Sequence, residues 1–144
     1  MKAAPSPEIT AALARRQTLF NTPDTDAFRL LHQAADGVPG LTVDRFAGVL
    51  VANVYGAQRL TPRQARNLRT LAAEVEARAV YVKYRPQQAS TLTAAQREAL
   101  APAAPWLGAA VPELIAYENG LRYLIRPGAG LSVGLFLDMR ETRA

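Results

Sequence analysis

The sequence has 144 residues, no cysteine and a single histidine, His32. Without cysteine, these residues cannot supply a disulfide, a cysteine-ligated zinc site or a thiol nucleophile. One histidine is a poor basis for a histidine metal site or a Ser-His-Asp triad, so we expect no metal site. A hydrogen-bonded structural role is a better interpretation of His32 than a catalytic or switching role.

Long apolar runs are also missing. No stretch approaches the roughly 20 apolar residues that cross a bilayer. Residues 1–6 (MKAAPS) lack the apolar core of a signal peptide. We therefore expect a cytoplasmic protein with no membrane partner.

Lysine is scarce, since Lys2 and Lys83 are the only two among 17 Lys and Arg residues. Against 12 Asp and Glu residues the formal net charge is +5, and arginine supplies nearly all of the positive charge. Guanidinium groups pair with phosphates through two hydrogen bonds and stack on bases, which favours an RNA partner. An alternative of equal weight is that the arginine and alanine content reflects a GC-rich genome.

Two helices stand out in a composition typical of one soluble globular domain, with or without a tail. Ser6, Pro7 and Glu8 supply an N-cap, a first-turn proline and a first-turn acid, which predicts a helix to about residue 20. A second helix should open at Thr61 and Pro62 and run to about residue 78. Its apolar face should pack on a sheet. Arginines form a stripe on the opposite face, which is either solvated or RNA-facing: Arg59, Arg63, Arg66 and Arg69.

Alternating and β-rich patterns predict strands over residues 28–32, 41–46, 49–55, 79–84, 114–118 and 121–126, with a short helix near 93–100. Residues 41–46 alternate apolar and polar side chains, as a half-buried strand does. Asn119-Gly120 predicts a tight hairpin, because both turn positions need positive φ. The order predicts an α+β fold: a mostly antiparallel sheet of β-meander, helix, strand and β-hairpin, flanked by helices.

Several patterns that resemble functional sites are better interpreted as structural. Gly128-Ala129-Gly130 with Gly134 misses the dinucleotide-binding spacing by one residue and lacks a βαβ unit, so a hinge-like turn is the better interpretation. Nothing in the sequence brings two carboxylates together for acid and base catalysis. The carboxylates considered are Asp36, Asp44, Glu118 and Asp138, and structural roles suit Asp36 and Asp44.

Basic and aromatic side chains interleave in residues 80–85 (VYVKYR). Such a strand suits base stacking combined with phosphate contacts. The alternative is an ordinary strand with one wet face.

Three segments resemble the bacterial large-subunit ribosomal RNA (cytosine-5-)methyltransferases. They are residues 25–46 (TDAFRLLHQAADGVPGLTVDRF), 117–123 (YENGLRY) and 134–143 (GLFLDMRETR). The third is similar to the segment that leads into the S-adenosylmethionine-binding fold of that family. Their order matches, and together they span most of the chain from Thr25 onward.

The resemblance implies a PUA-type RNA-binding domain, a small α+β central domain and a Rossmann-like methyltransferase domain. We expect a connecting helix at residues 1–24, the RNA-facing central domain at 25–127, and a linker with the truncated start of the methyltransferase domain at 128–144. The implied cofactor is S-adenosylmethionine, and the implied partner is rRNA. Residues that would border the cofactor are Phe136, Leu137, Asp138 and Arg140. Met139 stands where the family usually has glutamine, and it cannot make the same hydrogen bonds.

The RNA face is inferred from charge and strand position, not from a matched motif. We assign it to Arg45, Lys83, Arg85 and Arg122.

Methylation at cytosine C5 proceeds through addition of a thiolate to C6. Because the chain has no cysteine, we assign it no catalytic residue and expect negligible methyl transfer by it alone. Three hypotheses remain: a piece of a split or truncated methyltransferase, a stand-alone RNA-binding module, or an inactive α+β remnant. The first admits a separately encoded catalytic domain as partner, and exposed apolar surface near residues 131–137 admits a homodimer.

Overall fold

The computed structural model describes residues 6–85 and 93–131. Along the chain its helices are α1 (Pro7–Arg15), α2 (Gln17–Phe20), the 3-10 helix η1 (Gln33–Asp36), α3 (Pro62–Glu74) and α4 (Ala94–Leu100). Its strands are β1 (Ala27–His32), β2 (Leu41–Phe46), β3 (Val49–Tyr55), β4 (Ala79–Arg85), β5 (Leu107–Gly108), β6 (Leu114–Glu118) and β7 (Leu121–Ile125).

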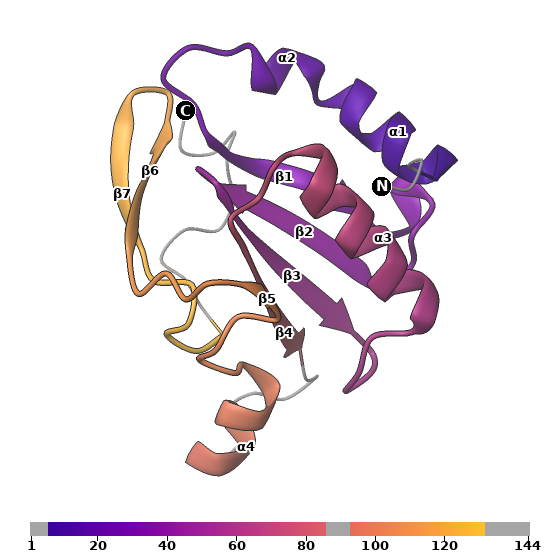
Figure 1. Cartoon of the computed structure of the whole chain (residues 1–144), viewed down its shortest axis with the longest axis vertical. Helices are drawn as coiled ribbons and strands as arrows, with labels where there is room; N and C mark the ends of the chain where they lie inside the picture. Colours follow the sequence, from indigo (N-terminus) through magenta and orange to yellow (C-terminus); the bar gives the residue numbers. More distant parts are fainter. Residues whose placement is uncertain (1–5, 86–92, 132–144) are drawn as a thin grey trace.

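Within these ranges β1 to β5 form one sheet in sequence order, and β6 and β7 form a separate two-stranded sheet (Figure 1). Every pair is antiparallel except β3 and β4, which run parallel because α3 carries the chain back across the sheet. The predicted α+β fold with a mostly antiparallel sheet is therefore confirmed. The short strand β5 was not predicted, because two residues carry no readable periodicity.

The predicted helix over residues 6–20 is interrupted at Arg16, which separates α1 from α2. Its N-terminus is as expected, with the Ser6 side chain accepting a hydrogen bond from the amide of Ile9. The guanidinium of Arg16 turns to the backbone carbonyl of Arg29 (3.2 Å) and to the Asp36 carboxylate. These tertiary contacts accompany the break in the helix.

The second predicted helix ends at Glu74 and not near residue 78. Glu76 takes φ +56°, and the amide of Ala77 donates to the carbonyl of Ala72 at 2.9 Å. This is the Schellman arrangement, in which a left-handed residue closes a helix. At the other end, Thr61 and Gln64 form the capping box, each side chain accepting from the other residue's amide.

One face of the sheet packs against α1, α2 and α3 (Figure 1). Phe28, Leu41 and Leu50 from the strands meet Ile9 and Leu71 from the helices, all of them buried. Each such side chain contributes about 1.5–3 kcal/mol relative to exposure. Through this core α1 packs directly on the sheet. No helix in the described ranges is long and apolar enough to span a bilayer.

The hairpin of β6 and β7 packs on the opposite face, where Phe46, Val51 and Tyr81 meet Ala116 and Ile125. The hairpin covers Phe46, and Thr42 and Asp44 on the same face of β2 are buried as well, so the expectation of a half-buried strand was wrong. The turn is as predicted, with Asn119 at φ +52° and Gly120 at φ +82°.

The tip of the hairpin is fastened to residues 24–26 by four hydrogen bonds. Asp26 donates its amide to the carbonyl of Tyr117 (2.9 Å) and accepts from the amide of Tyr117 through Oδ1 (2.7 Å). Gly120 donates to the carbonyl of Asp24 (2.9 Å), and Asn119 to the hydroxyl of Thr25 (3.0 Å). These bonds fix the end of the hairpin that carries the turn between β6 and β7.

Candidate functional site

The sheet face that carries the hairpin changes from apolar to polar along its strands. A row of directly paired residues crosses four strands near one end of the sheet: His32, Thr42, Asn53 and Lys83. All except His32 are buried, and the Thr42 hydroxyl has no hydrogen-bond partner among the described residues. Buried polar groups carry a cost unless they are bonded, so this row is a candidate for a functional or specificity role.

Lys83 lies in this row and is fully buried. Its Nζ donates to the carbonyl of Gly130, in the segment that follows the hairpin. Burial, and secondarily the nearby Arg85 cation, lower the pKa of Lys83 to about 8 from the model-peptide value of 10.5. The Lys83 side chain therefore faces the protein interior and a neighbouring segment.

Arg85 lies two residues further along β4, on the same face as Lys83. Its Nε donates to Asn53 Oδ1 at 2.8 Å, and part of the side chain stays exposed. Burial lowers the pKa of Arg85, although Tyr55 and Asp44 act in the opposite direction. Arg85 thus presents a cation at the edge of the polar row.

Arg45 points to the other side of the sheet. Its guanidinium carbon lies 5.2 Å from the ring centroid of Phe20 and 5.3 Å from that of Phe28. Those rings are themselves in edge contact, 5.0 Å apart. Burial lowers the pKa of Arg45, while Asp26 acts to raise it. The side chain is engaged in cation–π contacts with the helical layer.

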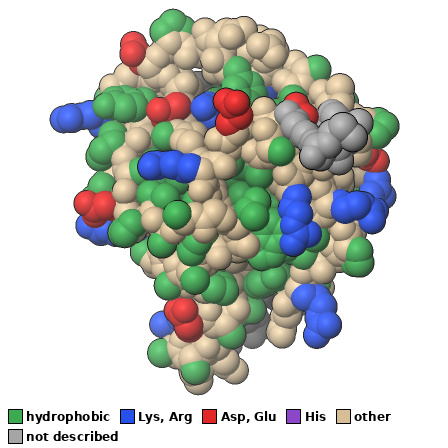
Figure 2. Space-filling model, viewed as in Figure 1, with side chains coloured by type: hydrophobic (Ala, Val, Ile, Leu, Met, Phe, Trp, Pro, Cys, Tyr) green, Lys and Arg blue, Asp and Glu red, His purple; other side chains and the backbone are tan. Residues whose placement is uncertain are grey.

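Arg122 is exposed on β7, directly opposite Tyr117 on β6. Together with Ile115 and Leu124 it forms the outer face of the hairpin, which is exposed. The four residues predicted as one RNA face therefore occupy three places: the polar row, the helical side and the hairpin. Figure 2 likewise shows Lys and Arg side chains spread over the face in view.

The arginine stripe of α3 is exposed, as an isolated amphipathic helix predicts. Two of its members have structural partners: Arg63 pairs with Glu8, and Arg69 lies 4.7 Å from the ring centroid of Trp106. Arg59 and Arg66 complete the exposed stripe.

Asp36 and Asp44 have structural partners, as expected, and Asp138 lies outside the described residues. Asp44 accepts from Arg29 Nε at 2.7 Å, and Arg29 also contacts His32 Nδ1 at 3.1 Å. Glu118 is buried in the hairpin. In the ranges that the structure describes, no three His, Cys, Asp or Glu side chains are grouped as metal ligands.

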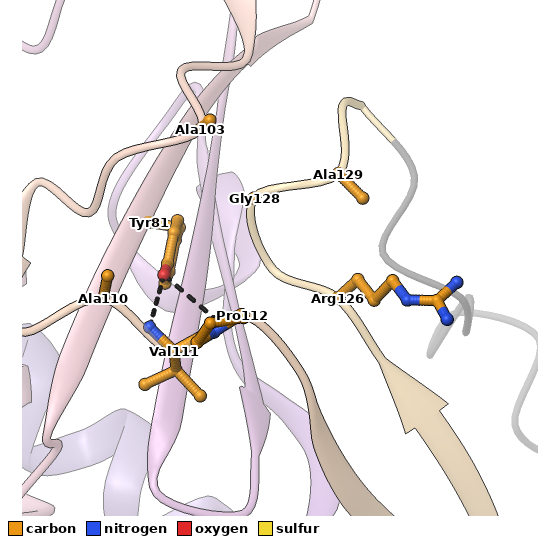
Figure 3. A pocket seen from close by; sticks show the side chains of 8 residues that line it. All are labelled: Tyr81, Ala103, Ala110, Val111, Pro112, Arg126, Gly128 and Ala129. Carbon is orange, nitrogen blue, oxygen red and sulfur yellow. Dashed lines mark hydrogen bonds between the residues drawn. The ribbon is translucent and has the colours of Figure 1, made fainter.

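A cavity of about 340 Å³ lies between the sheet and the segment after the hairpin (Figure 3). Its lining is mostly apolar: Tyr81, Ala103, Ala110, Val111, Pro112, Arg126, Gly128 and Ala129. Tyr81 Oη accepts from the amide of Val111 (2.8 Å) and donates to its carbonyl (3.3 Å). The hydroxyl of Tyr81 at the cavity wall is therefore already hydrogen-bonded within the protein. Among the described residues that line the cavity, no cluster of polar groups is present that would orient a substrate.

The predicted cofactor-bordering residues lie outside the described residues: Phe136, Leu137, Asp138 and Arg140, together with Gly134 and Met139. Sequence reasoning missed the polar row. It could have been found only by aligning the strands, because its members come from four strands and share a register that includes a bulge in β1.

Relatives of known name match the chain over nearly all of its length. A ribosomal RNA large subunit methyltransferase of Deinococcus radiodurans is 36% identical over 142 residues, covering 94% of this chain and 33% of the relative. Ribosomal RNA large subunit methyltransferase I of Shewanella denitrificans is 30% identical over 140 residues, with the same coverage. No protein-family model matches the chain.

Solved structures share the fold. One protein described as a methyltransferase, crystallised with SAH, superposes with a TM-score of 0.68 at 21% identity, covering 94% of this chain and 32% of that one. Another, described as a SAM-dependent methyltransferase of Streptococcus mutans, gives 0.66 at 21% identity, covering 94% and 33%. At this identity the likeness establishes the fold alone.

The chain spans about a third of the length of the curated relatives it matches. The resemblance in the three sequence segments is thereby confirmed: this chain is homologous to a stretch of the ribosomal RNA large subunit methyltransferases that makes up about one third of their length.

Proposed function

We propose that the chain is the RNA-positioning part of an S-adenosylmethionine-dependent methyltransferase that acts on cytosine C5 of large-subunit rRNA. The observation that carries this proposal is the match of 94% of the chain to rRNA large subunit methyltransferases. The central domain would occupy residues 25–127, preceded by a connecting helix and followed by the start of the methyltransferase domain. Acting on ribosomal RNA would place the protein in the cytoplasm.

Catalysis would come from elsewhere. Addition to cytosine C6 needs a thiolate, and the 144 residues contain no cysteine. The thiol would belong to another part of the same protein or to a separately encoded polypeptide. S-adenosylmethionine is the cofactor we propose, and a structural neighbour bound to SAH supports it. Phe136, Leu137, Asp138 and Arg140 would border it.

RNA contact needs cations that reach solvent. Arg122 and Arg85 satisfy this requirement, and so do Arg59, just before α3, and Arg66 on α3. Lys83 and Arg45 satisfy it less well, because Lys83 is buried beneath Gly130 and Arg45 lies over two rings. We therefore propose that the exposed arginines contact phosphates, while Lys83 and Arg45 act within the domain.

Binding of a large-subunit rRNA fragment to the 144-residue chain tests this, measured by fluorescence anisotropy across a salt series. We expect the logarithm of the affinity to fall linearly with the logarithm of salt concentration. Arg122→Ala and Arg66→Ala should each reduce the slope by about one if each contacts a phosphate. Arg97→Ala, an exposed arginine on α4, is the matched control and should leave the slope unchanged.

Methyl transfer is tested with radiolabelled S-adenosylmethionine and undermodified ribosomes. No label should enter the RNA with this chain alone. Methylated cytosine formed by the purified chain would disprove the assignment of catalysis elsewhere, and absence of salt-dependent RNA binding would disprove RNA positioning.

A further inference from the structure

The segment that leaves the hairpin lies closely against the sheet domain. Ile125 and Pro127 are buried, and the amide of Ala129 donates to the carbonyl of Arg126 at 3.1 Å. A Cβ added to Gly128 would lie 2.5 Å from the carbonyl oxygen of Ala103, which is closer than real Cβ atoms approach. Glycine is therefore required at this point for the backbone to reach its neighbour.

A second contact holds the same segment two residues later. Lys83 Nζ, from β4 in the large sheet, donates to the carbonyl of Gly130. The two contacts come from different supports, since Ala103 follows α4 and Lys83 lies in the sheet. One contact would allow rotation about its own position, whereas two set the direction of the segment.

The support beneath these contacts is itself well fixed (Figure 3). Tyr81 binds both the amide and the carbonyl of Val111, and the amide of Trp106 donates to the carbonyl of Val80 at 2.7 Å. A Cβ on Gly108 would lie 2.2 Å from the carbonyl oxygen of Arg78, so the chain around residues 103–112 also lies tightly on β4.

Stability alone does not account for a lysine at this position. A buried ammonium that meets a backbone carbonyl loses its hydration, and an apolar side chain of similar length would fill the space at lower cost. What the ammonium adds is a directed bond to Gly130. The lysine therefore fixes the position of the Gly130 carbonyl, which an apolar side chain would not do.

We infer that residues 126–130 form a clamped junction, and that Lys83 and Gly128 are positioning residues that set the direction in which the chain leaves the sheet domain. The purpose of the clamp rests on the proposed function. A methyl group reaches its target base only if the RNA-contacting surface and the cofactor keep a fixed distance and orientation. Small misplacements of reacting groups lower the reaction rate steeply. The junction would maintain that relation.

Distance measurement by pulsed electron resonance tests the clamp in the whole chain. The absence of native cysteine allows nitroxide labels at Ala73→Cys, exposed on α3 and not among the proposed RNA contacts, and Leu131→Cys, just after the junction. We expect a single narrow distance distribution. Lys83→Met, which keeps the length and removes the donor, should broaden it, and Gly128→Ala should broaden or displace it.

Arg126→Ala is the matched control, because this exposed side chain lies in the same segment and makes a long contact (3.5 Å) with Glu113. It should leave the distribution narrow. The melting temperature of Lys83→Met should not fall, so a broader distribution in that variant cannot come from unfolding. If Gly128→Ala does not fold, the Lys83 variant alone decides.

A distribution that stays as narrow in Lys83→Met as in the parent chain would overturn the inference. The same samples are assayed for rRNA binding, which none of the junction variants should alter. Loss of RNA binding by the labelled parent chain would count against the proposed function and leave the clamp standing, so the two failures are distinguishable.

Discussion

The hydroxyl of Tyr81 binds both polar groups of one residue, Val111: it accepts from the amide at 2.8 Å and donates to the carbonyl at 3.3 Å. Both residues are buried and lie 30 positions apart in the sequence. This pair attaches the loop before the hairpin to the sheet and forms the wall of the cavity in Figure 3.

Tyr81→Phe should therefore lower the free energy of unfolding by about 1–3 kcal/mol, because it leaves a buried amide and carbonyl unsatisfied. Urea denaturation followed by circular dichroism measures the change. Tyr117→Phe is the control, since that side chain is 37% exposed, and its effect should stay within about 0.5 kcal/mol. Equal effects of the two substitutions would contradict the structural role assigned to Tyr81.

Glycine is needed at position 108 for two reasons, a positive φ and a close backbone neighbour, and a comparison with Gly56 separates them. Gly108 has φ +84°, and a Cβ there would lie 2.2 Å from the carbonyl oxygen of Arg78. Gly56 has φ +78° with nothing within 4 Å of such a Cβ. Gly56→Ala should cost about 1–2 kcal/mol, the price of a left-handed non-glycine residue. Gly108→Ala should cost clearly more, and thermal denaturation of the two variants checks the difference.

Asp36 should stabilise the fold at neutral pH and lose that effect in acid. Burial alone would raise its pKa, but hydrogen bonds from Arg16, Arg15 and the amide of His32 outweigh burial and lower the pKa to about 2 from 3.8. A lowered acid pKa means that the unfolded chain binds the proton more readily. The contribution is therefore present above about pH 4 and lost as pH falls towards 2.

Asp36→Asn should remove this pH dependence and reduce stability at pH 7. The measurement is the free energy of unfolding of both proteins between pH 2 and pH 7. If the difference between them does not shrink as pH falls towards 2, the carboxylate contacts do not contribute as described.

Lys83 should also make stability rise with pH, but for a different reason: its charged form carries a cost, whereas the charged form of Asp36 stabilises. Its folded pKa of about 8 lies below the model-peptide value of 10.5, so the unfolded chain holds the proton more tightly. The cost of burying the charge is present below pH 8 and is relieved as pH rises from about 8 to 10.5. Stability relative to Lys83→Met should rise across that window.

NMR of the chain labelled at lysine Cε measures this titration directly, because the sequence contains two lysines, Lys2 and Lys83. Lys83→Met assigns the signals by removing one of them. A Lys83 signal that titrates near 10.5 would show that the ammonium is not held in the buried position.

Local structure followed from the sequence where neighbouring residues decide it. Ser6 and Thr61 were predicted to start helices, and both accept the expected amide hydrogen bond. Asn119 and Gly120 both take positive φ, as their hairpin required. These outcomes depend on residues within one turn of each other, which the order of amino acids specifies directly.

Helix ends and burial depended on partners far along the chain. Arg16 interrupts the first helix while binding Asp36, 20 residues away, and β2 is buried on both faces, with the hairpin covering Phe46. Neither partner is visible in a local pattern, so the helix over residues 6–20 and the half-buried strand were predicted wrongly in these details.

The amino-acid order alone determined the arginine-based charge, the absence of a thiol and the succession of the longer helices and strands. Only the tertiary structure decided which cations share a surface. Alternation along one strand places Lys83 and Arg85 on the same face, but strand pairing and the cover of each face put Arg45 on the helical side and Lys83 beneath Gly130. Burial is a property of the packed layers, and residues distant in sequence create it.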